Sequence, residues 1–265
     1  MKNRLLDDIN NADYVIVGIG DRFGYDWNKL SEDSRYNDLV EQIGEDGELI
    51  WIIPYLQKVV MDMNPDNRLK SGFEAIGKIL EGKDYYVLTT TIDDYIYGSC
   101  LNQNRIVTPC GGFRRLQCEK ACKDVLINVP SALLQYVQKL YNEEMNLDEM
   151  RDKFPECPDC GANLIFNQIG CENYIENGYL SDWTIYQKWL EMTMNKKIVM
   201  LELGVGLGFM SVIRKPFENL ATYNLKSILY RVHPTLYMGT HEIAERCINI
   251  PENPIDWITG IYKES

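Results

Sequence analysis

The stretch Val87-Leu-Thr-Thr-Thr-Ile-Asp-Asp94 begins as an apolar β run and ends in polar side chains. It is followed by Thr108-Pro-Cys-Gly-Gly-Phe113 and then by the cysteine pair Cys118 and Cys122. A buried strand whose carboxyl end turns polar is typical of a parallel sheet that binds a ligand along that edge. The stretch therefore predicts a ligand pocket that leads directly into half of a metal site.

Two further apolar runs end in glycine. Residues 13–17 precede Gly18-Ile-Gly20, and residues 197–203 precede Gly204-Val-Gly206-Leu-Gly208. Glycine at the carboxyl end of a parallel strand lets the backbone approach a phosphate closely. The first turn does not complete the pattern G-x-G-x-x-G, because Phe23 stands in the place of the third glycine. By itself this turn is as typical of a plain strand end as of a nucleotide site.

The strands alternate with helices along the chain. Apolar residues recur at helical spacing between residues 28 and 80, before the strand at residues 85–90. This alternation predicts an α/β fold with a Rossmann-like parallel sheet. We expect the sheet domain to comprise residues 1–109 and 195–265, with a smaller zinc-binding lobe and its connecting helices at residues 110–194.

The strongest local signal is the cysteine spacing. Cys118-x3-Cys122 and Cys157-x2-Cys160 form two close pairs that are separated by 34 residues. Each pair can present two thiolates from a turn, and four cysteines close a tetrahedral structural zinc site. The alternative is four unrelated buried cysteines, which the turn sequence Cys-Pro-Asp-Cys-Gly opposes. Zinc would hold the lobe together without entering a reaction, because no ligand position is left for water.

Composition excludes several classes of partner. The formal net charge is −12, whereas binding to nucleic acid by electrostatics needs basic patches. No segment approaches the roughly 18 uninterrupted apolar residues of a membrane span. The first residues contain no apolar signal segment, and the eight cysteines are spaced for metal rather than disulfides. We therefore expect a cytoplasmic protein without nucleic-acid or membrane partners.

The order of these motifs resembles the sirtuin family of NAD-dependent enzymes over nearly the full chain. The resemblance is closest to the macrodomain-linked bacterial branch, through Tyr86-Val-Leu-Thr-Thr90, residues 201–206 and Lys215-Pro-Phe217. Members of that branch are known as protein ADP-ribosyltransferases rather than efficient deacylases. The resemblance implies that NAD is the ligand, that zinc stabilises the lobe, and that a protein is the acceptor.

The resemblance also assigns site residues. Thr91 stands where sirtuins have the asparagine that organises the ribose and nicotinamide pocket, and Asp93 matches their nicotinamide-contacting aspartate. Arg22 is taken as the arginine that ends the first glycine loop, which is shorter here. The other cofactor contacts implied are Gly18, Ile19, Gly20, Phe23, Thr90, Gly204, Val205, Gly206 and Arg231.

Cys110 matches the position of the catalytic histidine of sirtuins, where the macrodomain-linked branch typically has glutamine. Three roles are open to it: a small residue beside a glycine turn, a spectator in the NAD pocket, or a nucleophile that receives ADP-ribose. To act as a base it would need a lowered thiol pKa, for which Arg114 or Arg115 is the candidate cause. The candidate catalytic residues are thus Cys110 and Thr91, and His233 is expected to be a surface or rim residue near the adenosine side.

Three functions compete at this point. The first is transfer of ADP-ribose from NAD to a protein, or a related deacylase reaction that consumes NAD. The second is a module that binds NAD or ADP-ribose without turnover, which the joint loss of asparagine and histidine favours. The third is a methyltransferase, because residues 199–208 look like its glycine-rich first motif. In that fold several strands must follow the motif, and the 57 residues after Gly208 are too few.

Overall fold

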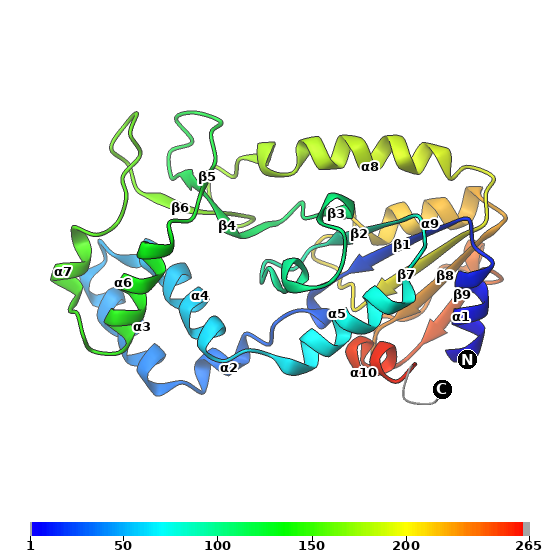
Figure 1. The fold of residues 1–265 in the computed structure, drawn as a ribbon, viewed down its shortest axis with the longest axis horizontal. Coiled ribbons are helices and arrows are strands. Elements are labelled where there is room, and N and C mark those ends of the chain that lie inside the picture. Colours follow the sequence, from blue (N-terminus) through cyan, green and yellow to red (C-terminus); the bar gives the residue numbers. More distant parts are fainter. Residues whose placement is uncertain (1, 262–265) are drawn as a thin grey trace. The chain divides into compact units, whose positions relative to one another are not determined.

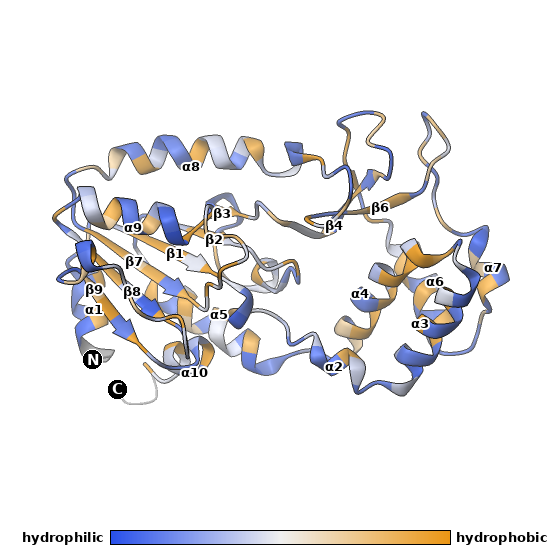
Figure 2. Cartoon of the chain, turned by 180° about the vertical axis from the view of Figure 1, so that it is seen from behind, coloured by the Kyte–Doolittle hydropathy of each residue, from blue (hydrophilic) through white to orange (hydrophobic). Residues whose placement is uncertain are grey.

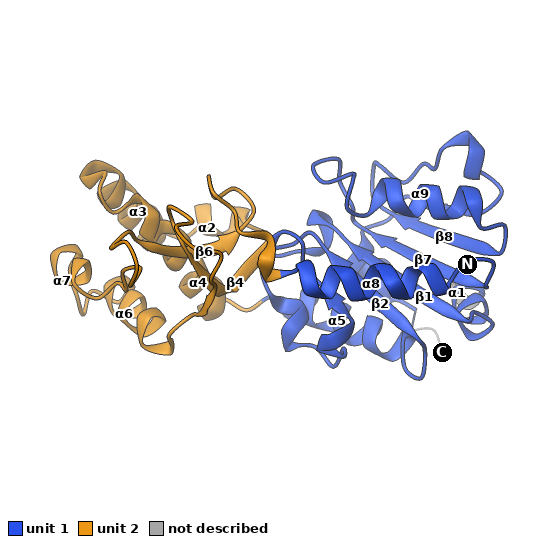
Figure 3. Cartoon of the chain, turned by 90° about the horizontal axis from the view of Figure 1, so that it is seen from above, with its two compact units in different colours: residues 1–25, 66–110, 179–265 blue, residues 26–65, 111–178 orange. Residues whose placement is uncertain are grey.

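Two compact units make up the chain in this computed structural model, which describes residues 2–261. The first unit contains residues 1–25, 66–110 and 179–265, and the second contains residues 26–65 and 111–178 (Figure 3). Each unit is thus built from segments that are far apart in the sequence. Within residues 2–261, no helix combines the length and the apolar character needed to cross a bilayer.

The first unit is organised around a six-stranded parallel sheet with the order β3-β2-β1-β7-β8-β9 (Figure 1). Its strands carry runs of valine, isoleucine and leucine, which Figure 2 shows as largely hydrophobic in β1 and β7. Such runs are expected where helices cover both faces of a sheet. The strands are β1 (Tyr14–Ile19), β2 (Tyr85–Thr89), β3 (Ile106–Val107), β7 (Ile198–Leu203), β8 (Ser227–Val232) and β9 (Cys247–Ile250). The α/β fold with a Rossmann-like sheet is confirmed.

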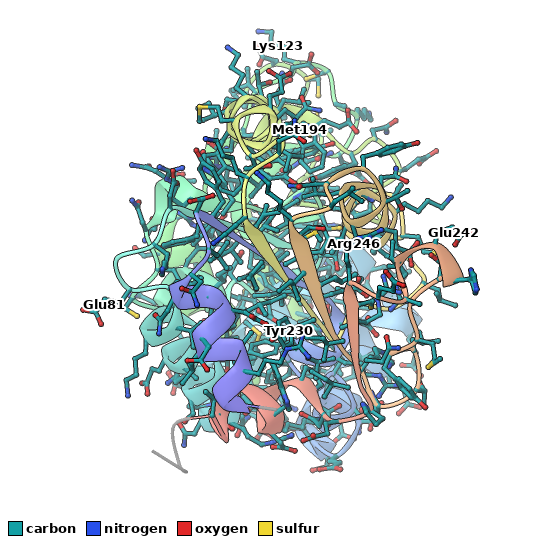
Figure 4. All side chains as sticks on the ribbon, turned by 90° about the vertical axis from the view of Figure 1, so that its right-hand side faces the viewer. Glu81, Lys123, Met194, Tyr230, Glu242 and Arg246 are labelled. Atoms are coloured by element: carbon teal, nitrogen blue, oxygen red, sulfur yellow. The ribbon has the colours of Figure 1, made fainter. Side chains whose placement is uncertain are left out.

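Alternate residues of β1 divide between the two faces of the sheet, as the strand period of two requires. Val15 and Val17 pack with α1 (Lys2–Asn10), α5 (Asn67–Ile79) and α10 (Pro254–Thr259). Ile16 packs on the opposite face with α8 (Leu180–Met192) and α9 (Arg214–Tyr223). Tyr230, labelled beside α1 in Figure 4, ties that helix to β8 by donating its hydroxyl to Asp8 at 2.5 Å.

The second unit combines helices with a three-stranded antiparallel sheet of order β5-β4-β6. Tilted and edge-to-face aromatic rings form its centre. The ring centroids of Tyr55 and Phe166 are 4.3 Å apart, and those of Phe166 and Phe113 are 4.9 Å apart. Its elements are α2 (Asn28–Ser31), α3 (Ser34–Asp46), α4 (Ile53–Met63), β4 (Gly111–Cys118), β5 (Ile127–Asn128), α6 (Ser131–Tyr141), α7 (Leu147–Arg151) and β6 (Leu164–Gln168). Short 3-10 turns complete the chain: η1 (Asp21–Phe23), η2 (Ile50–Ile52), η3 (Tyr95–Gly98), η4 (Gln103–Arg105), η5 (Glu176–Gly178) and η6 (His241–Ile243).

The boundaries of these units differ from the predicted division in two places. Residues 26–65 were expected in the sheet domain, but Tyr55 packs on the rings of β6 and Arg35 bonds the carbonyl of Leu140 in α6. Residues 179–194 were expected in the lobe, but Trp189 packs in the core on one face of the sheet. Of the predicted sheet domain, residues 1 and 262–265 lie outside the described part of the chain.

Candidate functional site

The carboxyl ends of β1 and β7 meet at the point where the strand order of the sheet reverses. The amide of Gly20 donates to the carbonyl of Leu203 (3.0 Å), and the amide of Arg22 donates to the carbonyl of Gly204 (3.1 Å). Ligands of open α/β sheets bind at this switch point, outside the carboxyl ends of the strands. The two glycine turns predicted from the sequence therefore form a single backbone structure at the expected position.

Glycine is required in this structure because the two turns touch through their backbones. A β-carbon on Gly20 would lie 2.4 Å from the Cα of Val205. Gly204 has a φ of +67°, and its β-carbon would lie 2.8 Å from the Cβ of Arg22. Glycine is required at position 18 for a different reason, because a β-carbon there would lie 2.3 Å from a methyl carbon of Ile213. Gly18 therefore serves the packing of the sheet against the segment before α9, rather than an approach to a ligand.

Replacing Gly20 by alanine is expected to destabilise the first unit, because the nearest obstacle is backbone and cannot rotate away. Overpacking of this kind costs about 1–3 kcal/mol. The matched control is Gly208→Ala, since a β-carbon there meets nothing within 4 Å. Urea unfolding of both variants measures the difference, and equal unfolding free energies would contradict the close approach of the turns.

The side chains of the first glycine turn point in opposite directions. Ile19 and Phe23 are completely buried, and the Phe23 ring packs edge-to-face on Phe73 with 5.3 Å between centroids. They can therefore face a ligand through their backbones alone. Arg22 is exposed at the end of the turn, where its guanidinium is available to an anion.

Asp93 joins the segment after β2 to the segment after β1. Its Oδ2 accepts the amide of Tyr25 (2.8 Å) and its Oδ1 accepts the amide of Tyr95 (3.0 Å), while the residue is 3% exposed. Burial raises the pKa of the Asp93 carboxyl to about 6, against the opposing effect of the two amide hydrogen bonds. The group is therefore mainly a carboxylate at neutral pH and places a fixed negative charge near the switch point.

The raised pKa of Asp93 gives a defined pH dependence. The folded value of about 6 exceeds the ordinary value of about 3.9, so the folded state binds the proton more tightly. The stabilisation is fully present below about pH 4 and is lost as the pH rises through 6. Relative to Asp93→Asn, the unfolding free energy of the natural chain should fall by on the order of 3 kcal/mol between pH 4 and 7. Parallel pH profiles from chemical denaturation would contradict this.

Three consecutive threonines hold the end of β2. The amide of Thr90 donates to the carbonyl of Ile19 (3.0 Å), which continues the pairing with β1. The hydroxyl of Thr91 is 2.9 Å from that of Thr89, and its methyl carbon would lie 3.0 Å from a β-carbon on Gly24. Thr91 is 8% exposed. Its hydroxyl is thus hydrogen-bonded to that of Thr89, and either hydroxyl can be the donor.

Cys110 is 2% exposed and is the last residue of segment 66–110 of the first unit. Burial raises the pKa of its thiol to about 12. The thiol is therefore uncharged at neutral pH, which favours the two passive roles over that of a nucleophile or base. Arg115, one of the two arginines named as a candidate cause of a lowered thiol pKa, donates its guanidinium to the carbonyl of Gly178 (3.1 Å).

Arg231 does not offer its side chain to a ligand, in contrast to the expectation. It is 1% exposed and donates to Glu202 and Glu218, at 2.9 Å each. Glu202 also accepts from Arg214 at 2.8 Å, and Arg214 in turn bonds the carbonyl of Val205 at 3.1 Å. These buried ion pairs thus support the second glycine turn through the hydrogen bond from Arg214 to the carbonyl of Val205. Neither Glu202 nor Arg214 was predicted from the sequence, although the one acid in the apolar run of β7 was a detectable signal.

His233 follows β8 at the same edge of the sheet, but it is 3% exposed rather than a surface residue. Its Nδ1 accepts the amides of Thr235 (3.1 Å) and Leu236 (2.9 Å), which places the ring proton on Nε2. Burial, and then the charge of Arg214, lowers the pKa of this imidazole. His233 is therefore neutral at pH 7 and presents a donor.

The predicted metal ligands come together in the second unit. The four sulfurs of Cys118, Cys122, Cys157 and Cys160 all lie within 4.8 Å of one another. The pairs 118–160 and 122–157 are each 3.5 Å apart, which is too long for a disulfide. Zinc–sulfur bonds of about 2.3 Å in a tetrahedron place the sulfurs about 3.8 Å apart. The four thiols therefore fit a structural zinc ion.

Local turns present these thiols. Gly161 has a φ of +71°, and its amide donates to the carbonyl of Cys157 (2.8 Å). Cys118 ends β4, and the amide of Ala121 donates to its carbonyl (2.9 Å). Each cysteine pair thus lies on a tight turn, as the spacing predicts.

Comparison with known proteins gives both distant sequence relatives and structural neighbours. No family model matches the chain. The chain is 20% identical over 267 residues to a protein of Staphylococcus aureus named "Protein ADP-ribosyltransferase", covering 95% of this chain and 84% of that protein. It is 27% identical over 146 residues to a protein of Fusarium oxysporum f. sp. cubense named "Probable bifunctional ADP-ribose hydrolase/ADP-ribosyltransferase", covering 52% of this chain and 24% of that protein.

The structural neighbours are Sir2 proteins. Sir2Tm bound to a propionylated peptide superposes with a TM-score of 0.58 at 14% identity, covering 99% of this chain and 97% of that one. A Sir2 mutant with a p53 peptide and NAD gives 0.58 at 15% identity, covering 100% and 98%. A mutant Sir2 homologue in complex with ADP-ribose gives 0.53 at 14% identity, covering 100% and 97%. The six-stranded parallel sheet, the paired glycine turns and the four-cysteine group therefore lie in a chain that has the sirtuin fold.

Proposed function

We propose that this protein is an NAD-dependent enzyme that transfers ADP-ribose to a protein. The observation that carries the proposal is the similarity to the Staphylococcus aureus protein ADP-ribosyltransferase, which spans 95% of this chain rather than a local motif. The two glycine turns at the switch point support it, because glycine turns at the carboxyl ends of parallel strands suit a pyrophosphate.

The site residues divide between binding and charge placement. We assign the pyrophosphate to the glycine turns at Gly20 and residues 204–206, where the amide of Gly206 is the candidate donor, with the exposed guanidinium of Arg22 beside it. In the reaction, the bond between nicotinamide and ribose breaks, nicotinamide leaves with the bonding electrons, and a nucleophile of the acceptor protein bonds to the ribose carbon. The buried carboxylate of Asp93 would stabilise the positive charge that develops on the sugar. Hydrogen bonds of Thr90 and Thr91 fix the end of β2, from which the chain leads to Asp93.

A second candidate function is binding of NAD or ADP-ribose without turnover. Two observations favour it: the thiol of Cys110 is uncharged at neutral pH, and the hydroxyl of Thr91 is hydrogen-bonded to Thr89. Neither side chain supplies a base. Under the first proposal, the acceptor must therefore bring a nucleophile that needs little activation, such as a carboxylate or a thiolate.

Incubation of the purified protein with NAD and candidate acceptor proteins tests these alternatives. Release of nicotinamide together with a mass increase of one ADP-ribose on an acceptor would support the enzyme. Thermal stabilisation by NAD without nicotinamide release would support the binding module instead. The absence of both stabilisation and turnover would refute both. Gly20→Ala is the variant expected to lose binding, with Gly208→Ala as its matched control.

We also assign the protein to the cytoplasm. All eight cysteines are unpaired thiols in the structure, and four of them form the group that fits zinc. Free thiols and cysteine-bound zinc suit a reducing compartment. Localisation of the tagged full chain in cell fractions tests this assignment.

A further inference from the structure

A carboxylate is hydrogen-bonded to the turn to which we assign the pyrophosphate. Oδ1 of Asp21 accepts the amide of Gly206 at 3.0 Å. A β-carbon on Gly206 would lie 2.6 Å from this same oxygen, so the carboxylate lies directly against the glycine. Backbone amides at glycine turns bind anions. Here an anion from the chain itself holds that position.

The Gly206 amide differs from five other amides of the two turns in the kind of acceptor it has. Those five donate to main-chain carbonyls, which cannot move without unfolding the turn: Gly20, Arg22, Phe23, Gly24 and Gly204. Gly206 donates to a side chain. Asp21 is exposed, and within residues 2–261 its carboxylate makes no second hydrogen bond. Rotation of one side chain therefore frees this amide at little cost.

The surroundings of Asp21 favour an anion at this point. Asp21, Arg22 and Arg214 all lie near enough to His233 to influence its pKa. Arg214 is committed to Glu202 and to main-chain carbonyls, so Arg22 is the cation that remains exposed. A phosphate oxygen would receive the Gly206 amide and the charge of Arg22, but only after Asp21 has moved away.

The geometry points to Asp21 as an internal competitor for the phosphate position. Its carboxylate and a phosphate of the dinucleotide would use the same amide and repel each other, so Asp21 weakens the binding of NAD and ADP-ribose. This inference rests on the proposed function and adds to it a residue that sets ligand affinity. Removing a residue from a binding turn ordinarily weakens binding. Removal of the Asp21 carboxylate should instead strengthen it, so the inference predicts a substitution effect of unusual sign.

Calorimetric titration with ADP-ribose tests the inference. Asp21→Ala should bind about tenfold more tightly than the natural chain, equivalent to about 1.4 kcal/mol, and Asp21→Asn should lie between the two. The asparagine side chain keeps an oxygen that can accept the Gly206 amide but carries no charge. Glu81→Ala is the control for net charge, since Glu81 is exposed in the same unit and follows α5.

The outcomes separate this inference from the proposed function. Weaker or unchanged binding by both Asp21 variants would overturn it, and weaker binding would assign Asp21 to a direct contact with the ligand. Tighter binding by Glu81→Ala to the same extent would also overturn it, because the effect would then be one of overall charge. If the natural chain releases nicotinamide from NAD while the variants show no gain, the inference alone fails. If ADP-ribose binds to none of the chains and NAD is neither bound nor cleaved, both fail.

Discussion

Replacing Cys157 by serine is expected to release the zinc ion and unfold the second unit. The thiol of Cys157 lies 3.5 Å from that of Cys122, within the group of four. Structural zinc contributes about 10–16 kcal/mol of apparent binding free energy in small zinc domains. This is comparable to the whole stability of a typical domain, about 5–15 kcal/mol. Elemental analysis should find one zinc per natural chain and none in the variant.

The matched control is Cys171→Ser, in the same unit but outside the four-cysteine group. The thiol of Cys171 donates to the carbonyl of Phe166 (3.1 Å), and a serine hydroxyl can make the same bond. This variant should keep its zinc and its thermal transition. A natural chain that is folded and metal-free, or equal loss of metal in both variants, would refute the structural zinc site.

Replacing Glu202 by glutamine is expected to cost about 3–5 kcal/mol of unfolding free energy, the usual effect of breaking a buried ion pair by removing one charge. Glu202 and Arg231 are each 1% exposed in their side chains and Arg214 is 7% exposed. Loss of the carboxylate leaves the two guanidinium groups with a single acid, Glu218, which is paired with Arg231. Urea unfolding measures the effect.

Glu218→Gln serves as the control for this second prediction. Its side chain is 19% exposed, and within residues 2–261 its carboxylate accepts a hydrogen bond from Arg231 only. Partial contact with water reduces the cost of losing the charge, so about 1 kcal/mol is expected. Equal effects of the two substitutions would contradict a special role for Glu202. Because Arg214 also bonds the carbonyl of Val205, Glu202→Gln should additionally weaken ADP-ribose binding.

Several features of the molecule were determined by the sequence by itself. The spacing of Cys118, Cys122, Cys157 and Cys160 predicted the metal group, because such pairs are brought together by local turns. Apolar runs followed by glycine predicted β1 and β7, and their alternation with helices predicted the parallel sheet. The same runs placed Gly20 and Gly204 at the carboxyl ends of these strands. In each case the deciding interactions lie within a few residues or follow from a period.

Only the tertiary structure decided which partners the other residues have. Residues 26–65 belong to the second unit because Tyr55 meets Phe166 across the sequence, and Arg231 is buried because Glu202 of the neighbouring strand holds it. Cys110 loses its acidity through burial, and Asp21 reaches the amide of Gly206 over 185 positions. Composition and periodicity specify which face of an element is buried. They do not specify which distant polar group a long side chain meets, because that depends on how the elements pack.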